Sequence, residues 1–417
     1  MNPSLRALWR PFPLLVSLFL LRAAAAAPAR AESLPVPIDQ VTALKSPITA
    51  AYSESPFLAT GPDGSAWMTW FERKAPDGHR LMIASYKAGR WSVGRQIAAG
   101  DSFYVNWAEI PEVLPLPGGR LMVTWPWKTA SDVISYGIRL GIGTTTGPLG
   151  RTTRPHGDNS YTPHGFQSLM TEGDGVRIVW LDGRFSVPKP DSAGDTELRT
   201  AFITRSGEVK DERVLDHRVC DCCRTAVVPV PGGALAVYRD RTADETRDIM
   251  LVRSEHGTWG QPYPLALDHW RIHGCPVNGP AADARGERVA VAWFTQGTSG
   301  EAMKVAFSSD AGRSFAAPIP VDSTAAIGRP QVMMLEDGSA LVLWITQRRR
   351  SFAAAIARVT PDGRVSPALT LGTLPRKAGG YPQMARVGDK LLFAWTDVQL
   401  TRPTAVSMLQ ARLLPLH

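Results

Sequence analysis

The sequence is poor in charge and has no long hydrophobic run. Charged residues make up 20% of the 417 positions, with 46 Lys and Arg against 38 Asp and Glu. The basic residues form no stripe, which argues against a nucleic-acid-binding protein. No apolar stretch reaches the roughly 20 residues that a transmembrane helix needs. We therefore predict no nucleic-acid partner and no transmembrane span.

Several common catalytic and structural patterns are also missing. The sequence has no P-loop, no dinucleotide-binding glycine motif, no Ser-His-Asp elbow and no His-Glu-x-x-His. It has no sustained 3.6-residue hydrophobic periodicity, which excludes an α-helical solenoid. Hydrophobic residues nevertheless reach 44%, so the chain is neither wholly disordered nor a low-complexity fibre.

The first 31 residues have the pattern of a secretory signal peptide. Arg6 and Arg10 precede the apolar run Leu14–Leu21, and Ala29-Arg30-Ala31 is a small-x-small cleavage site. We predict cleavage near Ala31 and a periplasmic or secreted mature protein, with an uncleaved anchor as the alternative. The leader holds four Arg and no acid, so the mature chain would keep 42 Lys and Arg against 38 Asp and Glu.

The rest of the sequence contains an internal repeat. A tight turn with Gly or Asp, then alternating apolar residues ending in an aromatic residue, recurs seven times. The copies end, 51 to 58 residues apart, at Trp70, Trp125, Trp180, Tyr238, Trp293, Trp344 and Trp395. Strand-turn-strand content at this period is typical of a β-propeller, in which each copy forms one four-stranded blade.

The ends of the mature chain suggest how the ring closes. One strand, around Ala405–Leu413, follows the last copy, and an orphan strand, Val36–Leu44, precedes the first. We predict that the orphan strand completes the last blade and leaves no long exposed edge. The predicted fold is all-β: a monomeric propeller of seven four-stranded blades over residues 32–417, with six blades as the alternative.

One turn points to a family. Ser308-Ser309-Asp310-Ala311-Gly312-Arg313-Ser314-Phe315 matches the pattern Ser-x-Asp-x-Gly-x-Ser/Thr-Phe/Trp. In this pattern the Asp and Ser side chains hydrogen-bond to the backbone of the turn, and the Gly adopts the backbone dihedral angle that the turn requires. The segment resembles the Asp-box, or BNR repeat, of sialidase-like propellers. The box residues would be Ser308, Asp310, Gly312, Ser314 and Phe315, on the turn between third and fourth strands.

The resemblance implies a set of catalytic candidates. Sialidases use an Arg triad for the substrate carboxylate, a Tyr nucleophile paired with Glu, and an acid/base Asp. The candidates in this chain are Arg329, Tyr381, Glu109, Arg239 and Arg241. The chain departs from the family where it opens Glu54-Ser55-Pro56-Phe57, without the family's opening Arg, and family sialidases usually have six blades.

The four cysteines lie in two short segments. They are Cys220, Cys222, Cys223 and Cys275, within Arg218–Arg224 and His273–Asn278. Both segments precede or begin innermost strands of adjacent repeats, so we expect them to converge at the channel mouth. Three interpretations stay open: two disulfides, a Cu(I) or Zn(II) site with His273 nearby, or a redox pair. The span Val219–Pro280 also resembles a segment of bacterial exported sialidase-like proteins.

Arg-rich loops should share that mouth. The candidates for ligand binding are Arg184, Arg239, Arg241, Arg247, Asn278 and Arg329. A planar Arg can grip a carboxylate or sulfate with two donors, whereas pairing with nearby Asp would only stiffen the loops. His156 and His164 lie in a polar loop that can face the same mouth.

Three functions remain open. The first is a non-enzymatic exported propeller that binds a small molecule, glycan or protein at a Cys- and Arg-lined mouth, with or without a soft metal. The second is a glycoside hydrolase of exo-α-sialidase type. The third is a scaffold in which every cysteine is paired.

Overall fold

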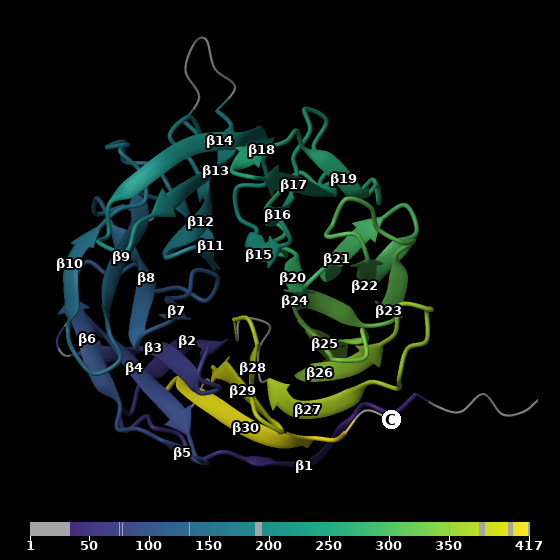
Figure 1. The fold of residues 1–417 in the computed structure, drawn as a ribbon, viewed down its shortest axis with the longest axis horizontal. Helices are drawn as coiled ribbons and strands as arrows, with labels where there is room; N and C mark the ends of the chain where they lie inside the picture. The colour runs from purple at the N-terminus through teal and green to yellow at the C-terminus, as the bar shows by residue number, and fades with distance from the viewer. Residues whose placement is uncertain are drawn as a thin grey trace, which may run out of the picture. The chain divides into compact units, whose positions relative to one another are not determined.

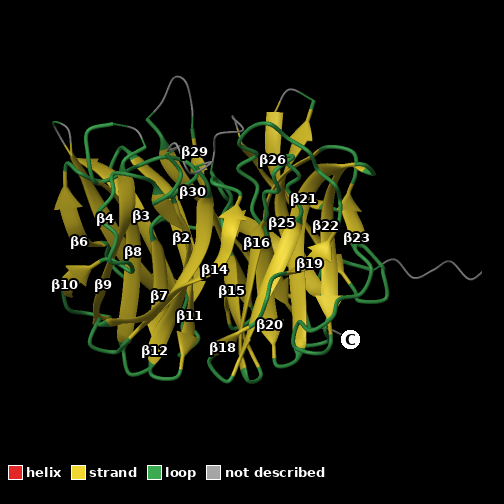
Figure 2. Ribbon diagram, turned by 90° about the horizontal axis from the view of Figure 1, so that it is seen from above, coloured by secondary structure: helices red, strands yellow, loops and turns green. Residues whose placement is uncertain are grey.

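Seven antiparallel sheets stand in a ring in the computed structural model (Figure 1). The structure describes residues 34–74, 76, 78–132, 134–187, 194–349, 351–374, 380–398 and 403–415. These residues form strands, turns and loops, and Figure 2 shows no helix among them. The predicted seven-bladed propeller is confirmed, and the six-bladed alternative is wrong.

The blades follow one another along the chain, each beginning with its innermost strand. Blade 1 contains β2 (Ser53–Thr60), β3 (Ala66–Lys74), β4 (Gly78–Lys87), the short β5 (Arg90–Trp91) and β6 (Arg95–Gly100). Blade 2 contains β7 (Glu112–Leu116), β8 (Arg120–Lys128), β9 (Tyr136–Thr144) and β10 (Leu149–Thr153). Blade 3 contains β11 (His164–Glu172), β12 (Gly175–Asp182), β13 (Thr196–Ile203) and β14 (Val209–Val219).

The remaining blades repeat this order. Blade 4 contains β15 (Ala226–Val230), β16 (Gly233–Arg239), β17 (Ile249–Glu255), the short β18 (Thr258–Trp259) and β19 (Tyr263–Ala266). Blade 5 contains β20 (Ala281–Arg285), β21 (Arg288–Gly297), β22 (Gly300–Ser308) and β23 (Ile319–Asp322). Blade 6 contains β24 (Ala326–Met334), β25 (Ala340–Arg348), β26 (Ser351–Val359) and β27 (Leu369–Leu374).

Blade 7 joins the two ends of the described chain. It contains β28 (Gln383–Val387), β29 (Lys390–Asp397), β30 (Ala405–Leu413) and β1 (Ile38–Ala43). β1 pairs antiparallel with β30, with Ile38 opposite Leu413 and Ala43 opposite Leu409. The orphan strand therefore closes the ring, as predicted.

The aromatic residues that mark the repeat are buried between blades. All seven lie in second strands and are at most 4% exposed. The N–H or O–H group of a buried aromatic ring needs a partner. Three of the seven residues find it in the preceding blade, on the outer strand or just after it. Trp293 Nε1 donates to Asp268 at 2.7 Å, Trp344 Nε1 donates to Asp322 at 3.0 Å, and the Tyr238 hydroxyl donates to Asp216.

The predicted signal peptide, residues 1–31 with its cleavage site Ala31, lies outside the described residues. The leader, the domain boundary at residue 32 and the export of the protein thus stay predictions. Within the described ranges, no helix has the length and apolar character needed to span a membrane.

The contact between Asp268 and Trp293 gives a stability prediction. We expect Asp268→Ala to lower the free energy of unfolding by about 1–3 kcal/mol, because the buried indole N–H loses its acceptor. Asp268 also pairs with Lys304 at 2.6 Å, and that contact is lost too. Thermal or urea unfolding measures the change. The exposed Asp101 provides the control, since Asp101→Ala should change stability by no more than about 0.5 kcal/mol. Equal stability of the two variants would contradict this role of Asp268.

Candidate functional site at the propeller mouth

Loops from neighbouring blades meet on one face of the ring, which we call the mouth. It is formed by the loops that enter innermost strands and by those that join second to third strands. Arg247 donates to Cys220 Sγ at 3.1 Å, and Arg239 Nε donates to the carbonyl of Asn278 at 2.9 Å. The structure thus brings together the three loops that carry the cysteines and the Arg239–Arg247 segment.

A β-bulge interrupts three innermost strands at their mouth ends. β2, β11 and β24 shift register there, and Ser55, Phe166 and Arg329 have positive φ of 56°, 52° and 57°. In each bulge the backbone N–H of that residue donates to a side chain of the preceding blade, which is Thr396, Glu109 and Asn278, respectively. Such conformations cost about 1–3 kcal/mol each and cluster at functional sites.

Only glycine fits immediately before two of these bulges. A Cβ atom on Gly328, which has φ of 95°, would lie 2.2 Å from Asn278 Oδ1. A Cβ atom on Gly165 would lie 2.3 Å from Glu109 Oε1. Because Gly328 and Gly165 have no side chain, the backbone can approach Asn278 and Glu109 this closely.

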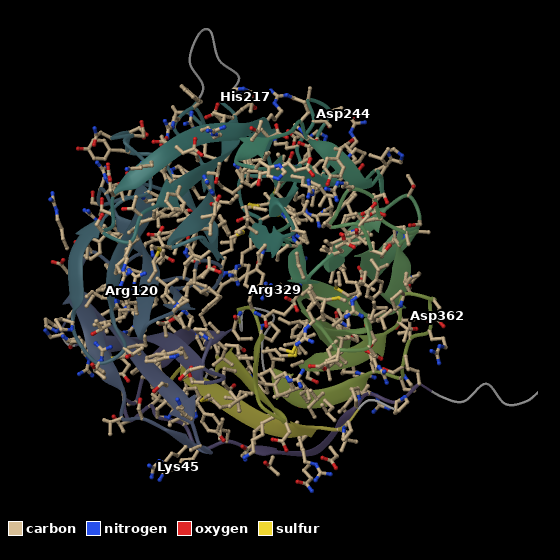
Figure 3. The ribbon with its side chains drawn as sticks, viewed as in Figure 1. Lys45, Arg120, His217, Asp244, Arg329 and Asp362 are labelled. Carbon is tan, nitrogen blue, oxygen red and sulfur yellow. A yellow bond between two sulfur atoms is a disulfide. The ribbon has the colours of Figure 1, made fainter. Side chains whose placement is uncertain are left out.

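Arg329 and Tyr381, two of the catalytic candidates, lie together at the inner end of the mouth. Figure 3 labels Arg329 near the centre of the ring. Its guanidinium stacks 4.1 Å from the Trp107 ring centroid and lies 5.8 Å from that of Tyr381. Nη1 of Arg329 donates to the carbonyl of Gly380 at 3.0 Å. The Tyr381 hydroxyl donates to the carbonyl of Val277 at 3.1 Å.

The sequence analysis missed two residues of this cluster, Arg224 and Glu112. Arg224 pairs with Glu112 at 2.5 Å, and its guanidinium lies 5.3 Å from the Tyr381 ring centroid. Both line a cavity of about 220 Å³ that innermost-strand residues of all seven blades enclose. Counting back from the aromatic residue of each repeat would have found Arg224, because Arg224 and Tyr381 both lie 14 residues before it, but not Glu112, which lies 13 residues before Trp125.

The carboxyl groups of the cluster have shifted pKa values. Burial raises the pKa of Glu109 to about 7, against the opposing influence of its hydrogen bond from Phe166, the nearby Tyr136 hydroxyl and the Arg224 charge. Burial raises the pKa of Glu112 to about 7 as well, although its ion pair with Arg224 opposes the shift. Burial also raises the pKa of Tyr381. Near neutral pH, the site therefore contains two carboxyl groups that can exchange protons and two guanidinium groups.

The other Arg candidates are engaged in contacts within the protein. Arg239 is 1% exposed and donates to the carbonyl groups of Asn278, Arg247 and Phe294, so it holds blades 4 and 5 together. Arg241 and Arg247 share the carboxylate of Glu245. Arg184 pairs with Asp182 and Glu212 at 2.7 Å each. Their assignment to ligand binding stays a prediction.

The cysteines form one disulfide and one pair of buried thiols. Cys222 is bonded to Cys275, which ties the loops of blades 4 and 5. Cys220 and Cys223 are free, with their sulfur atoms 2.9 Å apart. Burial opposes ionisation of Cys220, but the Cys223 hydrogen bond and the Arg247 charge outweigh it and lower the Cys220 pKa. Burial and Cys220 raise the pKa of Cys223.

A soft-metal site would need different bonding at these sulfurs. The sulfur atoms of Cys220, Cys222 and Cys223 lie within 4.8 Å of one another, as a metal would require. Cys222, however, is already bonded to Cys275. His273 is exposed and lines a rim pocket together with Cys275, Asp221 and Arg241. A metal site that includes Cys222 or Cys275 therefore requires that the disulfide first be reduced.

The segment that resembles an Asp-box lies between β22 and β23, the third and fourth strands of blade 5. The Ser308 hydroxyl accepts from the Gly312 N–H at 2.9 Å, and Asp310 accepts from the Ser314 N–H at 2.9 Å. Phe315 packs partly buried against the core between blades 4 and 5. The turn lies at the opposite ends of the strands from the mouth, so the contacts of this segment are structural.

The cysteine arrangement predicts an alkylation pattern. Iodoacetamide added to protein denatured without reductant should label two cysteines, Cys220 and Cys223, and peptide mapping should recover Cys222 linked to Cys275. The native protein should resist labelling, because Cys220 and Cys223 are at most 1% exposed. Denatured protein without free thiols would indicate two disulfides. Four labelled cysteines after removal of a metal would indicate a thiolate metal site.

The raised pKa of Glu109 predicts a pH dependence of stability. The folded pKa, about 7, exceeds the ordinary value of 4.5, so the protonated form is favoured by folding. This contribution is fully present below about pH 4.5 and is lost as the pH rises through 7. From pH 5 to 8 the wild type should therefore lose up to about 3 kcal/mol relative to Glu109→Gln.

Urea unfolding at each pH measures this difference between the two proteins. The exposed Glu208 provides the matched control. Glu208→Gln should follow the wild type across the range. A constant difference between wild type and Glu109→Gln would mean that Glu109 does not titrate with a raised pKa.

Comparison with known proteins shows the fold and no closer kinship. No family model and no curated protein matches the chain. A protein of unknown function from Dyadobacter fermentans is 12% identical, with a TM-score of 0.50 over 75% of this chain and 96% of that one. A polysaccharide lyase is 9% identical, with a TM-score of 0.52 over 87% and 90% of the two chains. A leech intramolecular trans-sialidase is 10% identical, with a TM-score of 0.45 over 87% and 68%.

Proposed function

We propose that the protein is an exported propeller that binds a carboxylate-bearing ligand, such as an acidic sugar, at the inner end of the mouth. The observation that carries the proposal is the pair of guanidinium groups, Arg224 and Arg329, which lie 5.3 and 5.8 Å from the Tyr381 ring centroid. Arg offers two parallel donors that match a carboxylate, and an aromatic ring offers a face on which a sugar can pack.

The charge balance supports an anionic ligand. The cluster contains two guanidinium groups and the carboxyl groups of Glu109 and Glu112. Both carboxyl groups have pKa values of about 7, so they are partly protonated near neutral pH. The cluster then carries a net positive charge. Burial also lowers the pKa of Arg329. A bound anion would stabilise the charged form.

The backbone supports a preorganised site. Arg329 takes its positive φ in a bulge whose N–H is fixed by Asn278. Asn278 lies three residues after Cys275, so the disulfide to Cys222 restrains the same loop. The carbonyl of Val277 holds the Tyr381 hydroxyl. In this interpretation the disulfide restrains a loop next to the site, and no metal is required.

Hydrolysis of the exo-α-sialidase type is the second candidate function. The raised pKa of Glu109 favours it, because a group that titrates near 7 is suited to acid–base work. A Tyr nucleophile also needs a base that accepts its proton. Among the described residues, the hydroxyl of Tyr381 donates to a backbone carbonyl, and burial raises its pKa. Binding without turnover is therefore the better-supported function.

The test is binding of N-acetylneuraminic acid and of galacturonic acid, measured by calorimetry. Arg224→Gln and Arg329→Gln should each weaken binding at least about tenfold, the equivalent of one charge-assisted hydrogen bond. The control is Arg313→Gln, because Arg313 is exposed on the opposite face, where it pairs with Glu255. That variant should bind as the wild type does. Circular dichroism and the melting temperature confirm that each variant folds.

Two outcomes would contradict the proposal. One is the absence of binding to either acid, and the other is binding that neither Arg substitution weakens. Turnover of a fluorogenic sialoside that Tyr381→Phe abolishes would instead establish the hydrolase. If neither binding nor turnover occurs and no free thiol is found, the scaffold hypothesis would hold.

A further inference from the structure

The two free thiols lie against the disulfide that ties blades 4 and 5. The sulfur atom of Cys220 is 2.9 Å from that of Cys223 and 3.8 Å from that of Cys222. Cys222 is in turn bonded to Cys275. Heavy atoms within about 4 Å of each other are in contact. Cys220 Sγ therefore contacts both a thiol with which it can form a bond and a disulfide sulfur that it can attack.

The surroundings of Cys220 suit it to attack. The attacking species in thiol–disulfide exchange is the thiolate. Nη1 of the buried Arg247 donates to Cys220 Sγ at 3.1 Å. Burial opposes ionisation of Cys220, but the Cys223 hydrogen bond, the Arg247 charge and the backbone N–H of Cys222 outweigh it and lower the Cys220 pKa. A guanidinium group beside the sulfur thus compensates a charge that would otherwise be costly in the interior.

The spacing of the two thiols fits a bond between them. Cys220 and Cys223 have the spacing of a Cys-x-x-Cys motif, in which thiol pKa values are often lowered. Both side chains are at most 1% exposed. Solvent therefore does not reach this pair, and electrons can leave it only through neighbouring sulfur atoms.

Cys275 connects the cluster to solvent. Its side chain is exposed, whereas that of Cys222 is 7% exposed. Attack of Cys220 on Cys222 Sγ would release the Cys275 sulfur at the surface. There Cys275 lines a rim pocket of about 440 Å³ with His273 and with charged side chains of both signs, Asp221, Arg241, Glu245 and Arg247. A substrate that enters this pocket would meet the Cys275 sulfur.

We propose that the four cysteines form a thiol–disulfide exchange site, in which the buried pair Cys220 and Cys223 reduces an external disulfide through the rim pair Cys222 and Cys275. The substrate class is a disulfide that can reach Cys275 in the rim pocket. This activity goes beyond ligand binding at Arg224 and Arg329 and does not depend on it.

The exchange takes four displacements. The Cys220 thiolate attacks Cys222 Sγ, which forms the Cys220–Cys222 bond and releases Cys275 as a thiolate. Cys223 loses its proton and attacks Cys220, which forms the Cys220–Cys223 disulfide and releases Cys222. The Cys275 thiolate attacks the substrate disulfide, which forms a mixed disulfide and releases the first substrate thiolate. Cys222 attacks Cys275, which restores the rim disulfide and releases the second substrate thiolate.

Atoms and electrons balance over these steps. The thiols of Cys220 and Cys223 are oxidised to one disulfide, and the substrate disulfide is reduced to two thiols. The two protons lost by Cys220 and Cys223 pass to the two product thiolates. The rim disulfide breaks and forms again without net change, so the substrate disulfide is the oxidant.

The first test locates the thiols that appear in the native full chain. Wild-type protein with two free thiols is kept for hours with N-ethylmaleimide, then digested without reductant and mapped by mass spectrometry. Because the first displacement releases the Cys275 thiolate, the label should accumulate on Cys275, with Cys220 in a disulfide with Cys222 or Cys223. A brief exposure should leave the protein unlabelled, since both free thiols are buried.

Two maps would overturn the proposal. Label on Cys220 and Cys223, with Cys222 still bonded to Cys275, would mean that the buried thiols react directly after local opening. No label after prolonged exposure would mean that the sulfur atoms do not exchange. The map requires no variant, so it decides the matter even if a substituted protein fails to fold.

The second test measures reduction of a substrate. Oxidised glutathione and a disulfide-bonded peptide are the probes, which separate small from polypeptide substrates, and the wild type should release two thiols per chain from at least one of them. The double variant Cys222→Ala/Cys275→Ala should release them at least about tenfold more slowly, because its buried pair has no exposed partner. Equal or faster release by this variant, or no release by the wild type, would overturn the proposal.

The third test addresses the attacking thiolate. Arg247→Gln should slow labelling of Cys275 about three- to tenfold, because a pKa one unit higher lowers the thiolate fraction up to tenfold and the stronger nucleophile regains part of the rate. Arg271→Gln is the matched control, since Arg271 is exposed in the loop that carries Cys275. It should react as the wild type does, and melting temperatures check that both variants fold. Equal rates in the two variants would overturn the assignment of Cys220 as the attacking thiolate.

Discussion

The ring depends on one constraint: a blade cannot bury its two faces alone. Each sheet presents apolar side chains on both sides, and only neighbouring blades can cover them. Leu235 and Val237 of blade 4 share a buried cluster with Val291 and Trp293 of blade 5, for example. A row of blades would leave two bare faces at its ends, so the chain must return on itself. The pairing of β1 with β30 closes the ring.

The same packing brings polar groups of one blade into the next. On the outer side, Asp268 and Asp322 each receive the indole N–H of the following blade. At the mouth, Glu109 and Asn278 each receive a bulge N–H of the following blade. These buried polar groups are tolerated because each of them forms a hydrogen bond with a group of the neighbouring blade. The candidate site is thus built from residues that also join blades.

The repeat could be predicted from the sequence because a buried aromatic residue occupies the second strand of every blade. Trp293 and Trp344 contact their own blade and the adjacent blade. The repeat itself sets both of these contacts. The disulfide could not be predicted, because Cys222 and Cys223 are adjacent and their partners depend on side-chain direction. Arg224 was missed for a related reason. Its role follows from its distance to Tyr381, which lies three blades further along the chain.

The turns on the face opposite the mouth and the bulges at the mouth are held in different ways. On the face opposite the mouth, turns are capped by their own side chains, as Asp63 does for Ser65 and Asp337 for Ser339. Such contacts need no neighbour and stabilise only their own turn. At the mouth, strained residues such as Arg329 are held by side chains of another blade. Strain persists only where the surroundings over-determine it. A rigid ring supplies those surroundings at the mouth.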